Sequence, residues 1–276
     1  MRSAPRSPAP TRPAPTSRGA GAGLLAVGLL APLVPLLLWA VAGEFRYPAL
    51  LPTFSGRGLA LLGDDAVRSA LGTSVLIAAS VAVLATLAGA AAGRALGLYA
   101  FPGRRALQLL LLAPVLVPTL AVTLGIQVYF IRYGLADTVA GVVLVQLIPT
   151  VPYASLVMAA SFASFDPDAE DAGRVLGAGP LRRLRHVTLP AVAPGLAVAA
   201  LFAFLISWSE YILTLLIGGG TVQTLPLLLF ASIGSADLTA AAALSLVIAA
   251  PPLLLVGLTA RMLTGDRTAA VGFGHL

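Results

Sequence analysis

The chain has 276 residues, of which 58% are hydrophobic and 10% are charged, whereas a typical soluble domain carries about 25% charged residues. This composition excludes a soluble globular protein and indicates an all-α integral membrane protein. The net charge of +6 does not indicate a nucleic-acid partner, because the positions of the basic residues follow the membrane topology described below. The absence of cysteine excludes disulfides and thiolate metal sites.

Six stretches are long and apolar enough to cross the hydrocarbon core as helices, which takes about 20 residues. Their lengths do not match the ten-residue alternation of a membrane barrel. The prolines within or beside the spans predict kinks that neighbouring helices must satisfy. The predicted spans are roughly Leu24–Gly43, Ser69–Leu98, Ala106–Ile131, Thr138–Phe162, Ala191–Ile217 and Leu238–Leu263.

The N-terminal residues 1–22 are rich in Ala, Pro, Ser and Arg, which predicts a disordered tail. This tail and the apolar run after it also resemble a signal peptide, with Ala40-Val41-Ala42 as a cleavage site. Signal peptides have an apolar region of about 7–15 residues, and this run is longer. We therefore expect residues 23–65 to hold the first transmembrane helix and an extracytoplasmic loop.

Arginine placement predicts the orientation, because cytoplasmic loops carry an excess of basic residues. Every basic residue in the chain is arginine. If the N-terminus is cytoplasmic, the arginines on the external side are only Arg46, Arg57, Arg68 and Arg132. We therefore expect residues 1–22, the loop 166–190 and a C-terminal tail of residues 264–276 to lie in the cytoplasm.

The loop 166–190 has the pattern of two short helices. Asp166-Pro167 predicts a helix start, with three acids in the first turn, where the helix dipole favours them. Gly177 predicts the end of that helix in a left-handed conformation. Gly179-Pro180 predicts a second short helix bearing several arginines, and Pro190 predicts the start of the fifth span.

Two interpretations of this loop stay open from the residues alone. An amphipathic, arginine-rich helix can lie on anionic lipid headgroups. A corner punctuated by glycines and small side chains instead suits insertion into a cleft of another protein. The glycines favour the second interpretation, because a helix lying on headgroups has no need of a sharp corner.

The spacing within the loop resembles the EAA motif of permease subunits in binding-protein-dependent ABC importers. Asp171-Ala172-Gly173 is followed after three residues by Gly177, and after nine more by Val187-Thr188-Leu189-Pro190. The departures from the motif are Asp171 for Glu, Gly173 for Ala and Val187 for Ile. The resemblance covers about residues 66–263.

The resemblance implies six transmembrane helices of the type I (MetI-like) permease fold in a bacterial plasma or inner membrane, with residues 66–263 as the permease domain. It implies that the loop is a coupling helix that docks on a separate ATPase, where Asp171 pairs with a basic residue and Gly177 permits close approach. The implied partners are a second permease, identical or related, two cytoplasmic ATPase subunits and an extracytoplasmic solute-binding protein. No cofactor or metal is implied.

Catalysis within the chain itself is not predicted. A Walker A motif needs lysine, and the chain has none. The histidines are His186 and His275, so a histidine-based metal site or triad is not expected. A membrane-embedded enzyme and a passive channel are the alternatives, and transport without any ATPase would favour them.

The translocation pathway is expected around Ser207-Trp208-Ser209-Glu210-Tyr211 in the fifth span. A carboxylate at membrane depth faces a cavity or a partner, while the alternative is an interfacial Glu and Tyr near the end of the span. The following Thr224-Leu225-Pro226 resembles the branch of the family that handles polyamines, ferric iron, thiamine, sulfate and phosphonates. Polyamine permeases often carry two acids here, and Ser209 stands in place of the first.

Glycines at four-residue spacing occur in the second span. Gly89, Gly93 and Gly97, together with Ala85, form the pattern of a close helix contact. In a chain so rich in Ala and Gly, chance explains the spacing equally well.

Overall fold

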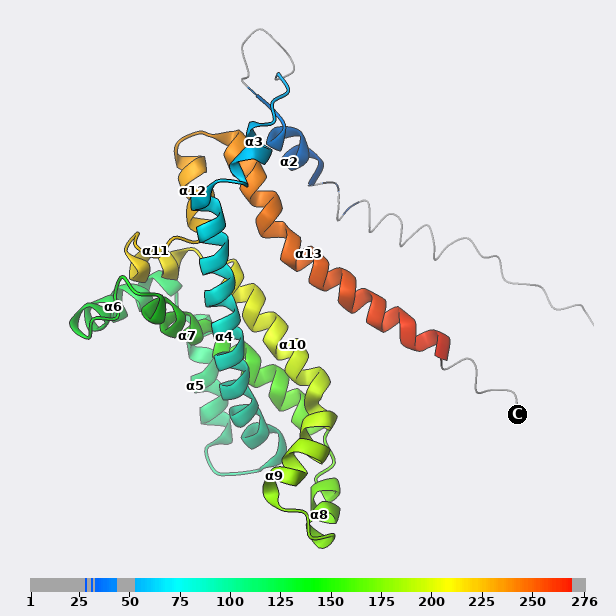
Figure 1. Ribbon diagram of the computed structural model, residues 1–276. Helices are drawn as coiled ribbons and strands as arrows, with labels where there is room; N and C mark the ends of the chain where they lie inside the picture. Colours follow the sequence, from blue (N-terminus) through cyan, green and yellow to red (C-terminus); the bar gives the residue numbers. More distant parts are fainter. Residues whose placement is uncertain (1–27, 29–30, 32, 44–52, 270–276) are drawn as a thin grey trace, which may run out of the picture.

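The computed structural model describes residues 28, 31, 33–43 and 53–269, and helices dominate the described chain (Figure 1). The predicted tail 1–22, residues 24–27, 29, 30 and 32 of the first predicted span, and residues 270–276 of the C-terminal tail lie outside the described residues. Within the described part, four helical stretches are long and apolar enough to cross a membrane, against the six spans predicted. They are Asp65–Leu98, Val139–Ala163, Pro180–Trp208 and Leu238–Leu255.

Three of these helices form the central bundle: α4 (Asp65–Leu98), α7 (Val139–Ala163) and α10 (Leu189–Trp208). In Figure 1 they run side by side, and α4 and α7 share the most extensive contact of any two elements. Buried apolar side chains, many of them alanine, fill the space between them, as in the cluster of Ala85, Ala154, Met158 and Ala199. The bundle is therefore held together by close packing, which is the main attraction between helices in a bilayer.

The glycine stripe of α4 is the closest part of that packing. A Cβ placed on Gly89 would lie 2.6 Å from the Cβ of Ala154, and one on Gly97 would lie 2.7 Å from the Cβ of Phe162. A Cβ on Gly93 would lie 2.7 Å from the backbone nitrogen of Ala159. The close helix contact is thus confirmed, and chance spacing is the wrong explanation.

The third predicted span, where the prolines predicted a kink, is interrupted at Pro118 and forms two separate helices. The structure has α5 (Arg104–Leu116) and α6 (Thr119–Arg132), with Val117 and Pro118 between them. Val117 adopts an extended conformation with φ −89° and ψ 136°. The ring of Pro118 disfavours the helical region for the residue before it, and proline has no N–H to donate.

The fifth predicted span also differs at both ends. It ends at Trp208 rather than Ile217, and α11 (Ile212–Gly218) follows as a separate short helix. At its start, α9 (Pro180–Arg183) continues through a π-helical turn (Leu184–Thr188) into α10 without a break. Pro190 does not open a new helix. Leu189 donates to the carbonyl of Leu184, five residues earlier, and such wider turns accommodate the N–H that a proline lacks.

The opposite end of the bundle is formed by α2 (Leu33–Ala40), α3 (Arg57–Leu61), α12 (Leu225–Gly234) and the start of α13 (Leu238–Ala269). Arg57 forms an ion pair with Asp237 at the start of α13. From there α13 runs away from α4 and α10 (Figure 1). An open, apolar groove of about 670 Å³ lies between these three helices and is lined by residues such as Val83, Phe204 and Leu254.

Candidate functional site

The first short helix of the loop, α8, spans Asp168–Val175, and its two ends follow the local signals. The Asp166 carboxylate accepts a hydrogen bond of 3.0 Å from the backbone N–H of Asp168. At the other end Gly177 has φ +77°. Its N–H donates to Arg174, and the N–H of Ala178 donates to Gly173, each at 3.0 Å. This is a Schellman ending, which needs a left-handed residue, so the predicted helix end at Gly177 is confirmed.

The corner between α8 and α9 presents apolar side chains to the outside. Val175, Leu176 and Leu181 are 88%, 86% and 76% exposed. They lie at the end of the molecule farthest from α3 and α12 (Figure 1). Apolar groups gathered at a projecting corner are typical of a surface that another protein covers.

The residues of the motif itself take different positions. Asp171 and Ala172 are exposed, and Asp171 forms an ion pair of 2.9 Å with Arg174 on its own helix. Gly173 lies against the Arg183 side chain, whose Cγ would be 3.2 Å from an added Cβ. The last motif residues, Val187, Leu189 and Pro190, lie at the π-helical turn and the start of α10. There Val187 is half-buried, while Leu189 and Pro190 are exposed.

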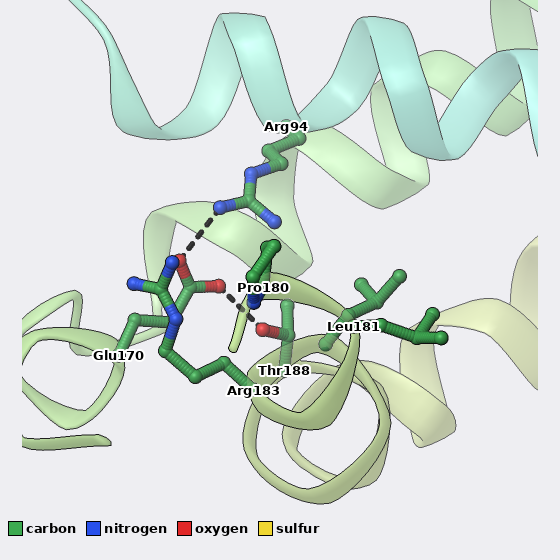
Figure 2. A pocket seen from close by; sticks show the side chains of 7 residues that line it. Arg94, Glu170, Pro180, Leu181, Arg183 and Thr188 are labelled. Carbon is green, nitrogen blue, oxygen red and sulfur yellow. Dashed lines mark hydrogen bonds and ion pairs between the residues drawn. The ribbon is translucent and has the colours of Figure 1, made fainter. Parts of the chain in front are cut away.

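A polar cluster that sequence reasoning missed connects the loop to the bundle (Figure 2). The Glu170 carboxylate is paired at 2.7 Å with the guanidinium of Arg94, near the end of α4. Its other oxygen accepts a hydrogen bond from the hydroxyl of Thr188. The side chains are largely buried, with 32% of Arg94 and 16% of Glu170 exposed. In the sequence, Glu170 is one of the three acids of the first turn of α8, where only the helix dipole accounts for it.

The charges around Glu170 keep it ionised. Burial by itself would raise the pKa of the Glu170 carboxyl. The hydrogen bond from Thr188, the hydrogen bond and charge of Arg94, and the charge of Arg183 together outweigh burial and hold this pKa below its ordinary value. Removing the carboxylate would leave Arg94 mostly buried without its partner. The cost should lie between the roughly 1 kcal/mol of an exposed pair and the 3–5 kcal/mol of a buried one.

A second polar cluster lies at the break between α10 and α11. The Gln146 side chain, in the first third of α7, donates to the Thr214 hydroxyl at 2.9 Å and accepts from the Ser207 hydroxyl. All three side chains are buried. Sequence reasoning found Ser207 but missed Gln146, although an amide within an apolar span signals a polar partner. The cluster joins α7, α10 and α11 where the helix is interrupted.

Three of the five predicted pathway residues, Ser207, Trp208 and Glu210, line one recess, whereas Ser209 and Tyr211 do not. Ser209 is exposed and its hydroxyl hydrogen-bonds to the carbonyls of Leu205 and Ile206. Glu210 accepts a 3.0 Å hydrogen bond from the N–H of Leu213, so it caps α11. It borders a closely packed recess that it shares with Gln146 and Ser207. The Glu210 carboxylate takes the N–H of Leu213 that a continuing helix would give to a backbone carbonyl, and such local bonds favour an interruption of the span here.

The two aromatic residues of this segment face other elements. The Trp208 indole N–H donates to the Ile248 carbonyl of α13 at 2.9 Å, and its ring stacks on Phe204. Tyr211 stacks on Phe230 of α12 with ring centroids 4.0 Å apart. Among the described residues, no group of three or more His, Asp and Glu side chains is placed to hold a metal ion.

Comparison with known proteins identifies the family. Residues 85–264 match the family described as binding-protein-dependent transport system inner membrane component, and the chain belongs to it. This is a family of membrane-embedded transport components. The chain is 28% identical over 218 residues to the putrescine transport system permease protein PotI of Escherichia coli strain K12, covering 74% of this chain and 75% of that one.

A putative ABC transporter permease protein, ORF1 of Streptomyces antibioticus, is 36% identical over 144 residues. That match covers 51% of this chain and 63% of the relative, so the chain spans less than two thirds of its length. Among solved structures, a bacterial ABC transporter involved in the import of the acidic polysaccharide alginate matches with a TM-score of 0.66 and 17% identity. The match covers 88% of this chain and 94% of the other, and it confirms the predicted permease fold.

Proposed function

We propose that this protein is a transmembrane permease subunit of an ATP-driven importer, which forms part of the translocation pathway for a small solute. Family membership supports this function. The observation within the structure that carries it is the projecting corner of α8 and α9, with Val175 and Leu176 exposed beside the motif residues. An ATP-driven transporter whose membrane subunit has no Walker A motif needs a surface on that subunit where a separate ATPase docks and transmits its movement.

The partners proposed with this function are those that membership of the family implies. Two cytoplasmic ATPase subunits dock on the α8–α9 corner of this permease and of a second permease, identical or related. An extracytoplasmic solute-binding protein delivers the solute at the opposite end, near α3 and α12. The arginine distribution supports this orientation, with both termini and the corner in the cytoplasm.

The solute is proposed to belong to the polyamine, ferric iron, thiamine, sulfate or phosphonate type. The similarity to a putrescine permease supports this class, while another member of the fold serves alginate import. The segment Ser207–Tyr211 with Gln146 is the proposed part of the pathway, because it is where polar side chains gather at an interrupted helix. The binding protein sets which solute arrives.

Gly177 offers a direct test of the docking surface. Nothing lies within 4 Å of a Cβ at this position, so a larger side chain would project outward. Gly177→Arg should leave the permease inserted at normal abundance but abolish co-purification of the ATPase and ATP-driven uptake. Gly177→Ala is the matched control, because it imposes the same left-handed strain of about 1–2 kcal/mol without the bulk.

The uptake assay uses proteoliposomes loaded with ATP and a panel of labelled solutes beginning with putrescine. Normal ATPase recovery and normal uptake in Gly177→Arg would refute docking at this corner. Uptake that persists in vesicles without any ATPase would instead favour a passive channel.

A further inference from the structure

The polar cluster of Arg94, Glu170 and Thr188, called the clasp below, has a mechanical consequence. Its members come from three segments: α4, α8 and the π-helical turn that leads into α10. Figure 2 shows the Glu170 carboxylate between the other two side chains, with Arg183 beside it. One carboxylate therefore joins the loop to two helices of the bundle at once.

Apart from Glu170, α8 makes few contacts with the helices of the bundle. None of its residues is buried, and Asp168, Ala169, Asp171 and Ala172 are all exposed. Its other contacts are with α9 and the π-helical turn, including Gly173 against the stem of Arg183. The chain enters α8 through an exposed Pro167 and leaves it at the left-handed Gly177. The ion pair to Arg94 is thus the tie between α8 and α4.

The helix at the other end of this tie is itself rigidly packed. Arg94 directly follows Gly93, where α4 and α7 approach so closely that no Cβ fits between them. Thr188 is 1% exposed and directly precedes α10. A displacement of α8 that keeps the clasp intact must therefore carry α4, α7 and the start of α10 with it, because packed interiors transmit strain rather than absorb it.

We propose that Glu170 is a positioning residue that holds α8 to α4 and α10, so that movement of a docked ATPase reaches the α4–α7 pair as well as α10. This role rests on the proposed function, since it supposes that α8 receives the ATPase. Without the clasp, α8 would still dock, but it would pivot about its ends at Pro167 and Gly177 and pass movement on only through the chain into α10.

Spin labels can measure this tie, because the chain has no native cysteine. Cysteines at Leu87, which is 64% exposed on α4, and at exposed Ala169 on α8 would report the separation of the two helices in the assembled transporter. Without nucleotide, the natural side chains should give one narrow distance peak. Glu170→Gln should lose that peak and give a broad distribution. Asp168→Asn, which removes an exposed charge from the same helix, should leave it narrow.

Trapping the transporter with ATP and vanadate tests the mechanical role. With the clasp intact, the Leu87–Ala169 distance should not change, because the two helices move together. In Glu170→Gln the distance should shift, because α8 follows the ATPase and α4 stays behind. Exchanging the charges, with Arg94→Glu and Glu170→Arg together, should restore the narrow peak that Arg94→Glu alone abolishes.

The outcomes separate this proposal from the proposed function. A narrow peak in Glu170→Gln, or equal broadening in Asp168→Asn, overturns the clasp. A broad peak in Glu170→Gln that does not shift on trapping leaves Glu170 as a positioning residue but overturns ATPase docking on α8. If Glu170→Gln fails to insert, Arg94→Gln breaks the same ion pair from the α4 side and should broaden the same peak. An unchanged narrow peak in that variant counts against the clasp.

Discussion

The contact between α4 and α7 predicts that a single methyl group at Gly93 will destabilise the bundle. In Gly93→Ala the new Cβ would lie 2.7 Å from the backbone nitrogen of Ala159 and from the carbonyl carbon of Met158. Ordinary contacts begin at 3.4 Å, so the two backbones must separate by at least about 0.7 Å where contact is now continuous. Overpacking of this kind typically costs about 1–3 kcal/mol.

Gly72→Ala is the matched control on the same helix. Nothing lies within 4 Å of a Cβ at Gly72, and alanine favours a helix over glycine by up to about 1 kcal/mol. Thermal unfolding of purified protein in detergent compares the two variants. At about 2–4 °C per kcal/mol for a chain of this size, Gly93→Ala should unfold roughly 2–12 °C lower than the unmodified protein, and Gly72→Ala at the same temperature or higher. Equal midpoints for both variants would refute the close contact.

The remaining predictions concern orientation and the pathway. Cysteines at exposed Arg185 and Ser235 should react with an impermeant reagent from opposite sides of the membrane, the first only from the cytoplasm, and labelling of both from one side would contradict the proposed topology. Glu210→Gln should keep the fold, because the amide oxygen can still accept the hydrogen bond from Leu213. It should lower uptake of labelled putrescine if the carboxylate serves a cationic solute, or weaken the permease pair in detergent if it is a structural partner. An intact pair with unchanged uptake would exclude both roles.

Features with a local cause were predictable from the residues. The apolar runs of α4 and α7 predicted these helices within a few residues, because a bilayer-spanning helix needs only length and hydrophobicity. Gly177 predicted its own left-handed helix end, because few other residues accept that conformation. The spacing from Asp171 to Pro190 was sufficient to indicate the family, which the match over residues 85–264 confirms.

Two errors in the predicted spans have causes that are also local. Pro118 breaks the third span, and at the end of the fifth the Glu210 carboxylate takes the backbone N–H of Leu213. Hydrophobicity averaged over a window does not register them, because it weighs transfer to lipid and not the backbone conformation of single residues. Pro190 was expected to begin a new helix. The helix instead continues through it, because the preceding π-helical turn accommodates the backbone N–H that proline lacks.

The sequence by itself thus determined the membrane class, the positions of the long helices, the glycine-terminated α8 and the family. Only the tertiary structure decided which polar residues meet. Glu170 lies 76 positions from Arg94, and Gln146 lies 68 positions from Thr214. The glycine stripe of α4 acquires meaning only where α7 lies against it. Local conformation depends on neighbours in the chain, whereas ion pairs and close contacts depend on how separate helices pack, and that information is spread over the whole sequence.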